Sequence, residues 1–177
     1  MALFSLREEL VKEHSKAQCN KIVAWVGSDQ KRFDELFTHF SGKELKLVKM
    51  AAWPMSYCVQ EHPALIKKHF TDIINILSKE KLIDAVKRNS LRALQCVDIP
   101  EKYEGQLMDL CFKYAAAPEE PIAVRVFALN VLSNLVKKYP EILPEIKLLI
   151  EENENHQTAA FKSVANKIKR TYFKNKK

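Results

Sequence analysis

Glycine is scarce in this sequence, with only 3 glycines among 177 residues. At the usual frequency of about 7%, a chain of this length would hold about 12. A phosphate-binding loop or a dinucleotide-binding fingerprint needs closely spaced glycines, and a β-rich fold needs them in its tight turns. The composition therefore excludes all three.

The sequence also lacks paired cysteines and long apolar runs. Its four cysteines, Cys19, Cys58, Cys96 and Cys111, are isolated from one another, with no CxxC pair. We expect no disulfide framework, and we expect these side chains to pack as small hydrophobes at helical spacing. No window approaches the roughly 18 apolar residues that a membrane span needs, and the N-terminus carries no secretory signal pattern. A cytoplasmic protein without a membrane segment is predicted.

Catalytic and metal-binding patterns are missing as well. Cys58 and His62 stand four residues apart and His69 follows, but no further cysteine, histidine or carboxylate completes a tetrahedral metal site, and HExxH is absent. GxSxG is absent, and no cysteine has an evident histidine partner. Adjacent carboxylates such as Glu8 and Glu9 do not face each other on a helix. The sequence predicts no enzyme, no cofactor and no metal.

Charge is plentiful, but its surplus lies at one end of the chain. The formal net charge is +7, and residues 158–177 carry seven basic residues and no acid, which leaves 22 of each sign in residues 1–157. A basic tail is a common device for binding nucleic acid, anionic membranes or acidic proteins. The alternative is solvation of a terminal helix, helped by cations near its C-terminus. The candidate contacts of this tail are Lys167, Lys169, Arg170 and Lys174.

Apolar residues recur at three- and four-residue spacing throughout, and no run alternates with period two, so an all-α fold is predicted. The pattern also repeats along the chain. An apolar residue followed by lysine or arginine recurs every 37 or 38 residues, at Val11, Val48, Val86, Val124 and Phe161. Four positions after each marker stands a small residue: Ser15, Ala52, Ser90, Ala128 and Ala165. We expect these small residues to let neighbouring helices approach closely.

A second apolar stripe lies 22, 25 and 26 positions after each of the first four markers, as in Phe33, Leu36 and Phe37. Offset 29 continues it in Phe40, Leu77 and Ala115, whereas Asn153 breaks it. Each repeat is therefore predicted to be a helix A, a turn and a helix B. The predicted turns hold helix breakers, namely Gly27-Ser28, with Ser28 as the expected N-cap, and Pro63, Pro100 and Pro140.

This pattern resembles the HEAT/armadillo-like class of α-solenoids over about residues 11–170, in the Val-Lys/Arg…Ala/Ser positions of helix A and the proline between helices. The aspartate that precedes the Val-Arg pair in that class is replaced by Leu47 and Ala85, so an inter-repeat Asp–Arg ladder is not expected. The resemblance implies one α-α superhelix domain, 1–177, of about 4.5 helix-pair repeats. The predicted elements are the pairs 4–41, 43–79, 82–117 and 119–154 and a capping helix 158–174.

The resemblance further implies that the B helices line a concave surface where ligands bind. The outward positions of these helices are polar and of mixed sign, whereas a duplex-binding groove should show one sign. We therefore predict a non-catalytic scaffold that binds a protein or peptide through this face. The alternative is that the face is only solvated and binds nothing. The predicted contact residues are Lys31, Lys68, Thr71, Asn75, Asp109 and Lys113.

The second functional alternative is nucleic-acid binding through the basic C-terminal helix, since some DNA-repair glycosylases are built from HEAT-like repeats. Trp25 and Trp53 fall on apolar positions of helix A, where packing explains them better than contact with DNA. The neutral body of the chain also argues against a DNA-repair surface. The partner's identity and the oligomeric state are left open.

Overall fold

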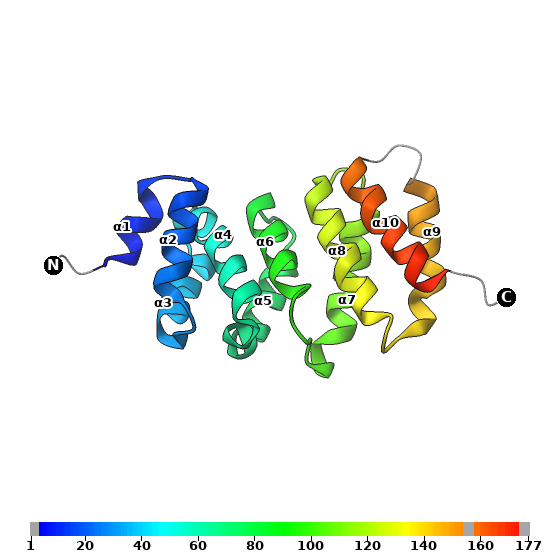
Figure 1. Cartoon of the computed structure of the whole chain (residues 1–177), viewed down its shortest axis with the longest axis horizontal. Coiled ribbons are helices and arrows are strands. Elements are labelled where there is room, and N and C mark those ends of the chain that lie inside the picture. Colours follow the sequence, from blue (N-terminus) through cyan, green and yellow to red (C-terminus); the bar gives the residue numbers. More distant parts are fainter. Residues whose placement is uncertain (1–3, 154–157, 174–177) are drawn as a thin grey trace. The chain divides into compact units, whose positions relative to one another are not determined.

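A computed structural model describes residues 4–153 and 158–173, and every regular element within these ranges is helical (Figure 1). The all-α prediction is confirmed. The elements are α1 (Leu6–Lys12), α2 (Lys16–Val26), α3 (Gln30–Ser41), α4 (Leu45–Glu61), the 3₁₀ helix η1 (Pro63–His69), α5 (Phe70–Leu77), α6 (Asp84–Leu94), α7 (Glu101–Ala116), α8 (Ile122–Leu135), the 3₁₀ helix η2 (Pro140–Ile142), α9 (Leu143–Asn153) and α10 (Ala159–Tyr172).

The helices form two compact units. The N-terminal unit, Met1–Ile99, contains α1 to α6, and the C-terminal unit, Pro100–Lys177, contains α7 to α10. The boundary falls inside the predicted third pair, 82–117, so that α6 and α7 belong to different units. The prediction of a single domain stays a prediction.

In the N-terminal unit, α4 packs against α1, α2, α3 and α6. The predicted stripe of the B helices faces inward here, because Phe33, Leu36, Phe40, Ile73 and Leu77 are all fully buried. Burying one such side chain contributes about 1.5–3 kcal/mol. The buried side chains of this stripe therefore stabilise the packing of α3 and α5 against the A helices.

In the C-terminal unit, α8 packs against both α7 and α10. Ala128 of α8 and Ala165 of α10 are buried, as is Ala52 of α4 in the other unit. These are the small residues of the repeat, and their minimal side chains let a neighbouring helix approach. Ser15 departs from the pattern. It caps α2 by accepting a 3.1 Å hydrogen bond from the Gln18 backbone N–H, rather than lying inside a helix.

The predicted turns lie where the breakers stand, with one correction. Gly27 ends α2 at φ 50°, a left-handed conformation that suits glycine. Asp29, not Ser28, is the N-cap of α3, because its Oδ1 accepts from the backbone N–H groups of Lys31 and Arg32 at 2.8 and 3.2 Å. The helix begins one residue later than predicted, and the carboxylate supplies the cap.

Prolines mark the other turns as predicted. Pro63 and Pro140 open η1 and η2, and Pro100 is the N-cap residue of α7. The capping helix predicted over 158–174 is α10, which spans Ala159–Tyr172.

Candidate partner-binding surfaces

The six predicted contact residues lie on B helices and are exposed, but they divide between the two units. Four belong to the N-terminal unit, with Lys31 on α3, Lys68 on η1, and Thr71 and Asn75 on α5. Asp109 and Lys113 lie on α7 in the C-terminal unit. Their role as contacts stays a prediction.

A polar cluster around Asp34 joins α3 to η1 on this face. Asp34 Oδ1 accepts a 2.9 Å hydrogen bond from Gln30 Nε2 and lies 2.8 Å from His69 Nε2. Its Oδ2 forms an ion pair with the Lys68 ammonium. The His69 ring stacks on Phe37, with ring centroids 4.0 Å apart. The side chain of the predicted contact Lys68 is thus held by an ion pair within the chain.

Burial alone would raise the pKa of the Asp34 carboxyl. Together, the hydrogen bonds from Lys68, Gln30 and His69 outweigh the effect of burial. The pKa of Asp34 therefore lies below its ordinary value. Asp34 therefore carries a negative charge at neutral pH and anchors the cluster. The spacing predicted Lys68 on the outward face but gave no signal for the pairing of Asp34 with His69, which lies 35 positions from Asp34.

In the C-terminal unit, a hollow of about 340 Å³ lies between the B helices α7 and α9. The predicted contact Lys113 lines it, and Leu148 stands at its edge with 56% of its surface exposed. Glu145 and Glu152 supply charge of the opposite sign, so the hollow combines apolar walls with a mixed-sign rim. The remaining lining residues are Phe112, Ala116 and Leu149.

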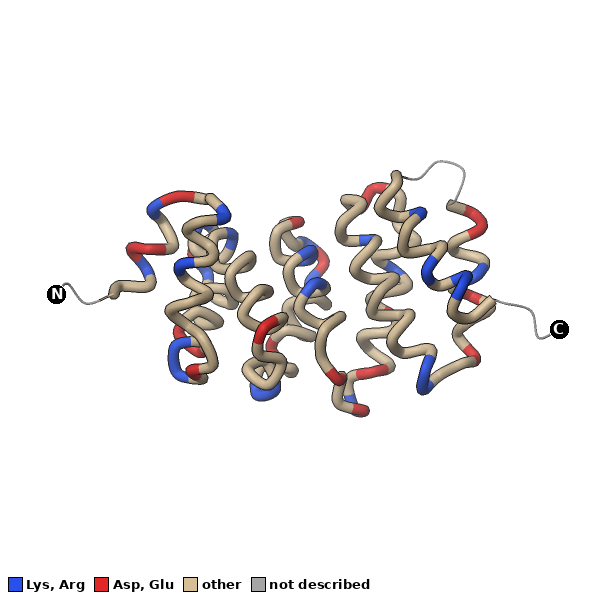
Figure 2. Tube along the Cα trace, in the orientation of Figure 1, with Lys and Arg blue, Asp and Glu red and all other residues tan. Residues whose placement is uncertain are grey.

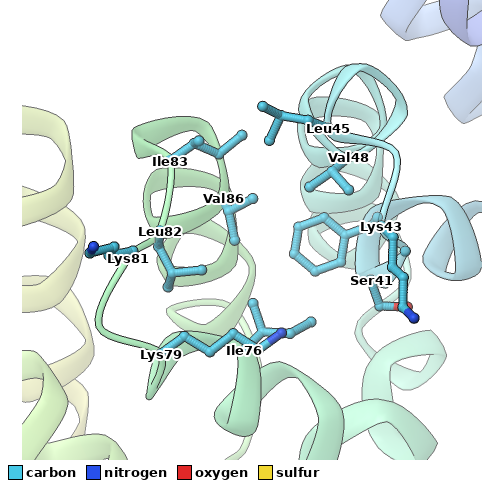
Figure 3. A pocket seen from close by; sticks show the side chains of 12 residues that line it. Ser41, Lys43, Leu45, Val48, Ile76, Lys79, Lys81, Leu82, Ile83 and Val86 are labelled. Atoms are coloured by element: carbon cyan, nitrogen blue, oxygen red, sulfur yellow. The ribbon is translucent and has the colours of Figure 1, made fainter.

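A second hollow, of about 180 Å³, lies in the N-terminal unit where α4 and α6 begin (Figure 3). Sequence analysis missed it, because it gathers the loops before two successive A helices rather than the outward face of a B helix. The available signal was an apolar residue near each helix start, Leu45 and Ile83, beside the loop lysines Lys43, Lys79 and Lys81. We name it the Leu45 pocket; it is lined by Phe40, Ser41, Gly42, Lys43, Leu45, Val48, Ile76, Lys79, Lys81, Leu82, Ile83 and Val86.

The basic tail is described only in part. On α10, Lys167 and Arg170 are exposed and Lys169 is half-buried, while Lys174 lies outside the described residues. The opposite side of α10 is apolar, and its Phe161 side chain is buried. Figure 2 shows basic residues along α10 and no acidic ones. Amphipathic packing as a cap thus accounts for the apolar face and leaves the basic face exposed.

The tryptophans pack on neighbouring rings but are not fully buried. Trp25 stacks on Phe4 with ring centroids 4.5 Å apart, and Trp53 lies 5.4 Å from His14. Within residues 4–153 and 158–173, no three histidine, cysteine or acidic side chains are grouped closely enough to hold a metal ion. In the same ranges, no helix combines the length and apolar character that crossing a bilayer requires.

Repeated helix pairs, with buried small residues on the A helices and a buried stripe on the B helices, define an α-solenoid repeat protein. A family model described as a HEAT repeat domain matches residues 6–172, and the chain belongs to the HEAT repeat family. Neither a search of the curated proteins nor a search of the solved structures found a significant match. HEAT repeats generally serve as protein-interaction scaffolds, and the family is typically non-catalytic.

Proposed function

We propose that this chain is a non-catalytic scaffold that binds a protein or peptide through the outward face of its B helices. The observation that carries the proposal is the hollow between α7 and α9, where Lys113 lies beside the exposed apolar side chain of Leu148. An apolar hollow with a polar rim is the arrangement of a protein-binding hot spot.

In this mechanism, an apolar side chain of the partner enters the hollow and contacts Leu148 and Phe112. Lys113 binds an acidic or carbonyl group of the partner, and Glu145 and Glu152 bind basic or amide groups. Mixed charges of this kind select partners by complementarity more than they add affinity. Because the hollow lies between two formed helices, binding orders little of the scaffold.

The N-terminal unit contributes a second polar face in this proposal. Lys31, Thr71 and Asn75 are exposed on α3 and α5. Lys68, the fourth predicted contact of this unit, forms an ion pair with Asp34. This face suits hydrogen bonding to a peptide rather than neutralisation of a phosphate backbone, which requires charge of one sign. A cytoplasmic location stays part of the proposal.

The test is a pull-down from lysate of the source cells with the full chain immobilised, with and without nuclease. We expect a protein that survives nuclease and high salt. Its retention should fall by about tenfold or more in Lys113→Glu and in Leu148→Ser, as for a hot-spot contact. Both residues are exposed, so neither change should disturb the core. Lys137→Glu, at another exposed lysine of the same unit, is the matched control and should retain the partner.

Two outcomes would contradict the proposal. A partner retained equally by all three variants would place binding elsewhere on the chain. Recovery of nucleic acid alone, lost at high salt and in the double variant Lys167→Gln and Arg170→Gln, would move the function to the basic helix α10, since phosphate contacts weaken steeply with salt.

A further inference from the structure

The Leu45 pocket is lined by apolar side chains from four helix ends together with polar groups of the loops between them. Figure 3 shows Leu45 and Val48 on one side facing Ile83 and Val86 on the other. Leu45 is 64% exposed, although it is a large apolar residue. Its exposed surface therefore adds to the apolar lining that a ligand could contact in this pocket.

The rim of the pocket is positively charged. Lys43, Lys79 and Lys81 line it, and no acidic residue does. Within the described parts of the chain, none of these three lysines forms an ion pair. The helices α4 and α6 also begin here, and neither N-cap residue makes a side-chain cap hydrogen bond. A helix N-terminus adds a partial positive charge to that of the lysines.

The acidic residues near these loops do not cancel this charge. Glu44 is paired with Arg7 at 2.8 Å, and Asp84 lies 3.8 Å from Lys87. Glu80 is exposed and does not line the pocket. Figure 3 shows the Lys81 side chain directed away from the hollow, so the pocket offers apolar side chains and the unpaired ammonium groups of Lys43 and Lys79 to a ligand.

We propose that the Leu45 pocket binds a segment of a partner protein in which one phenylalanine or leucine is flanked by acidic residues. A cavity of about 150 Å³ holds one benzene molecule. The pocket volume of about 180 Å³ thus fits a single apolar side chain and is too small for a lipid acyl chain. The lysines bind the flanking carboxylates, which sets the orientation of the segment and speeds its association.

The segments of this chain outside the described residues lack the required chemistry. Residues 174–177 carry three lysines and no acid, residues 1–3 carry no acid, and residues 154–157 contain no apolar side chain. None of these three segments is therefore a candidate for the occupant. This inference does not depend on the proposed function, since the Leu45 pocket contains none of the residues assigned to that function.

The test uses a short fluorescein-labelled peptide with one phenylalanine flanked on both sides by aspartates and glutamates, titrated with the full chain and followed by fluorescence anisotropy. We expect it to bind at least about tenfold more tightly than the same peptide with alanine in place of phenylalanine. A peptide with lysines in place of the acids should not bind.

Two variants locate the binding. The double variant Lys43→Glu and Lys79→Glu should weaken binding by about tenfold or more. The double variant Lys137→Glu and Lys162→Glu changes the net charge equally at exposed positions of the C-terminal unit and should bind as the parent does. Leu45→Ser should abolish the preference for phenylalanine while keeping the fold, because the side chain is mostly exposed.

Equal affinity for the phenylalanine and alanine peptides would overturn the proposal. So would equal weakening by the two double variants, which would indicate attraction to the net charge of the chain alone. Loss of binding in Lys113→Glu without loss in Leu45→Ser would place the peptide between α7 and α9, which overturns this inference and leaves the proposed function intact.

Discussion

The guanidinium of Arg125 on α8 donates a 2.7 Å hydrogen bond to the side-chain oxygen of Asn153 at the end of α9. Its Nε also donates to the backbone carbonyl of Ala115 on α7, at 3.1 Å, and its Cζ lies 5.4 Å from the centre of the Phe161 ring on α10. Arg125 is only 3% exposed. One buried cation thus joins the four α-helices of the C-terminal unit, α7 to α10.

This contact explains the position at which the apolar stripe of the repeat fails. Asn153 stands where the first three repeats carry Phe40, Leu77 and Ala115, because a buried arginine needs an acceptor. The arginine is bonded to an amide and a backbone carbonyl rather than to an aspartate.

We expect Arg125→Lys to lower the free energy of unfolding by about 1.5–3 kcal/mol, the range for hydrogen bonds of a charged group. Lysine keeps the charge but cannot reach both acceptors with a planar fork. Urea unfolding followed by circular dichroism measures the change. Lys162→Met alters the basic residue at the matching repeat position, where it is exposed, and should change stability by less than about 0.5 kcal/mol. A similar loss in both variants would contradict the structural role of Arg125.

The carboxyl group of Glu9 predicts a specific acid sensitivity. It accepts hydrogen bonds of 2.7–2.8 Å from Lys12, Lys21 and Gln18, which lower its pKa from 4.5 to about 2. A lowered folded-state pKa stabilises the fold above the unfolded value, and this stabilisation is lost as the pH falls. The difference in stability between the parent and Glu9→Gln should therefore be constant above pH 4.5 and shrink between 4.5 and about 2.

The measurement for Glu9 is the urea midpoint of both proteins across this pH range, followed by tryptophan fluorescence. Both tryptophans, Trp25 and Trp53, belong to the N-terminal unit that contains Glu9. Glu8→Gln removes the same charge from an exposed neighbouring position and should change stability by less than about 0.5 kcal/mol at neutral pH. A pH-independent difference for Glu9→Gln would show that its hydrogen bonds do not favour the charged form.

Substitutions of the adjacent residues Ser28 and Asp29 at the start of α3 should have different effects on stability. Asp29→Ala should lower the free energy of unfolding by about 1 kcal/mol, because two backbone N–H groups lose their acceptor. Ser28→Ala should change it by less than about 0.5 kcal/mol, since Ser28 is exposed and does not cap the helix. Tryptophan fluorescence during urea unfolding compares the two variants. The reverse ranking would restore Ser28 as the N-cap.

Cys96 differs from the other cysteines in its exposure. Cys19, Cys58 and Cys111 are buried as predicted, whereas Cys96 is exposed, so the expectation that all four pack as small hydrophobes is wrong for this residue. Burial raises the pKa of the Cys58 thiol to about 12 and that of Cys19 to about 11, which suppresses their reactive thiolates. We expect one thiol to react rapidly with an aromatic disulfide reagent in the native protein, and the other three only on unfolding.

Substitution identifies the reactive thiol. Cys96→Ser should remove the rapid phase, whereas Cys111→Ala should leave it unchanged because Cys111 is buried. Rapid reaction of a second thiol in the parent protein would show that one of the buried cysteines opens to solvent faster than the native packing allows.

The sequence predicted the helices and their inward faces well, because a helical face is a local property. Residues three and four positions apart share one side of a helix whatever surrounds it, so the burial of Phe33, Leu36 and Ile73 followed from spacing alone. Proline and glycine likewise act through the backbone of their own turn. The cap of α3 was displaced by one residue because Ser28 and Asp29 are both good N-caps, and the local pattern does not choose between them.

The candidate site could be predicted only as a face. Spacing placed Lys68 and Lys113 on the outward side of their helices, and the structure confirms that both are exposed. Spacing did not predict the pairing of Lys68 with Asp34 or the hollow beside Lys113. Each depends on how closely two separate helices pack, which is set by the whole core.

Local periodicity was enough to predict an all-α chain of repeated helix pairs, because the period of the apolar residues dictates which face each helix must bury. The roles of the remaining residues depend on how the helices pack. This packing buries Arg125 while leaving Lys49 exposed at the matching repeat position, and it joins two loops into the Leu45 pocket. The physical reason is that contacts between residues about 35 positions apart arise from the packing of whole helices, to which local periodicity contributes only the faces that meet.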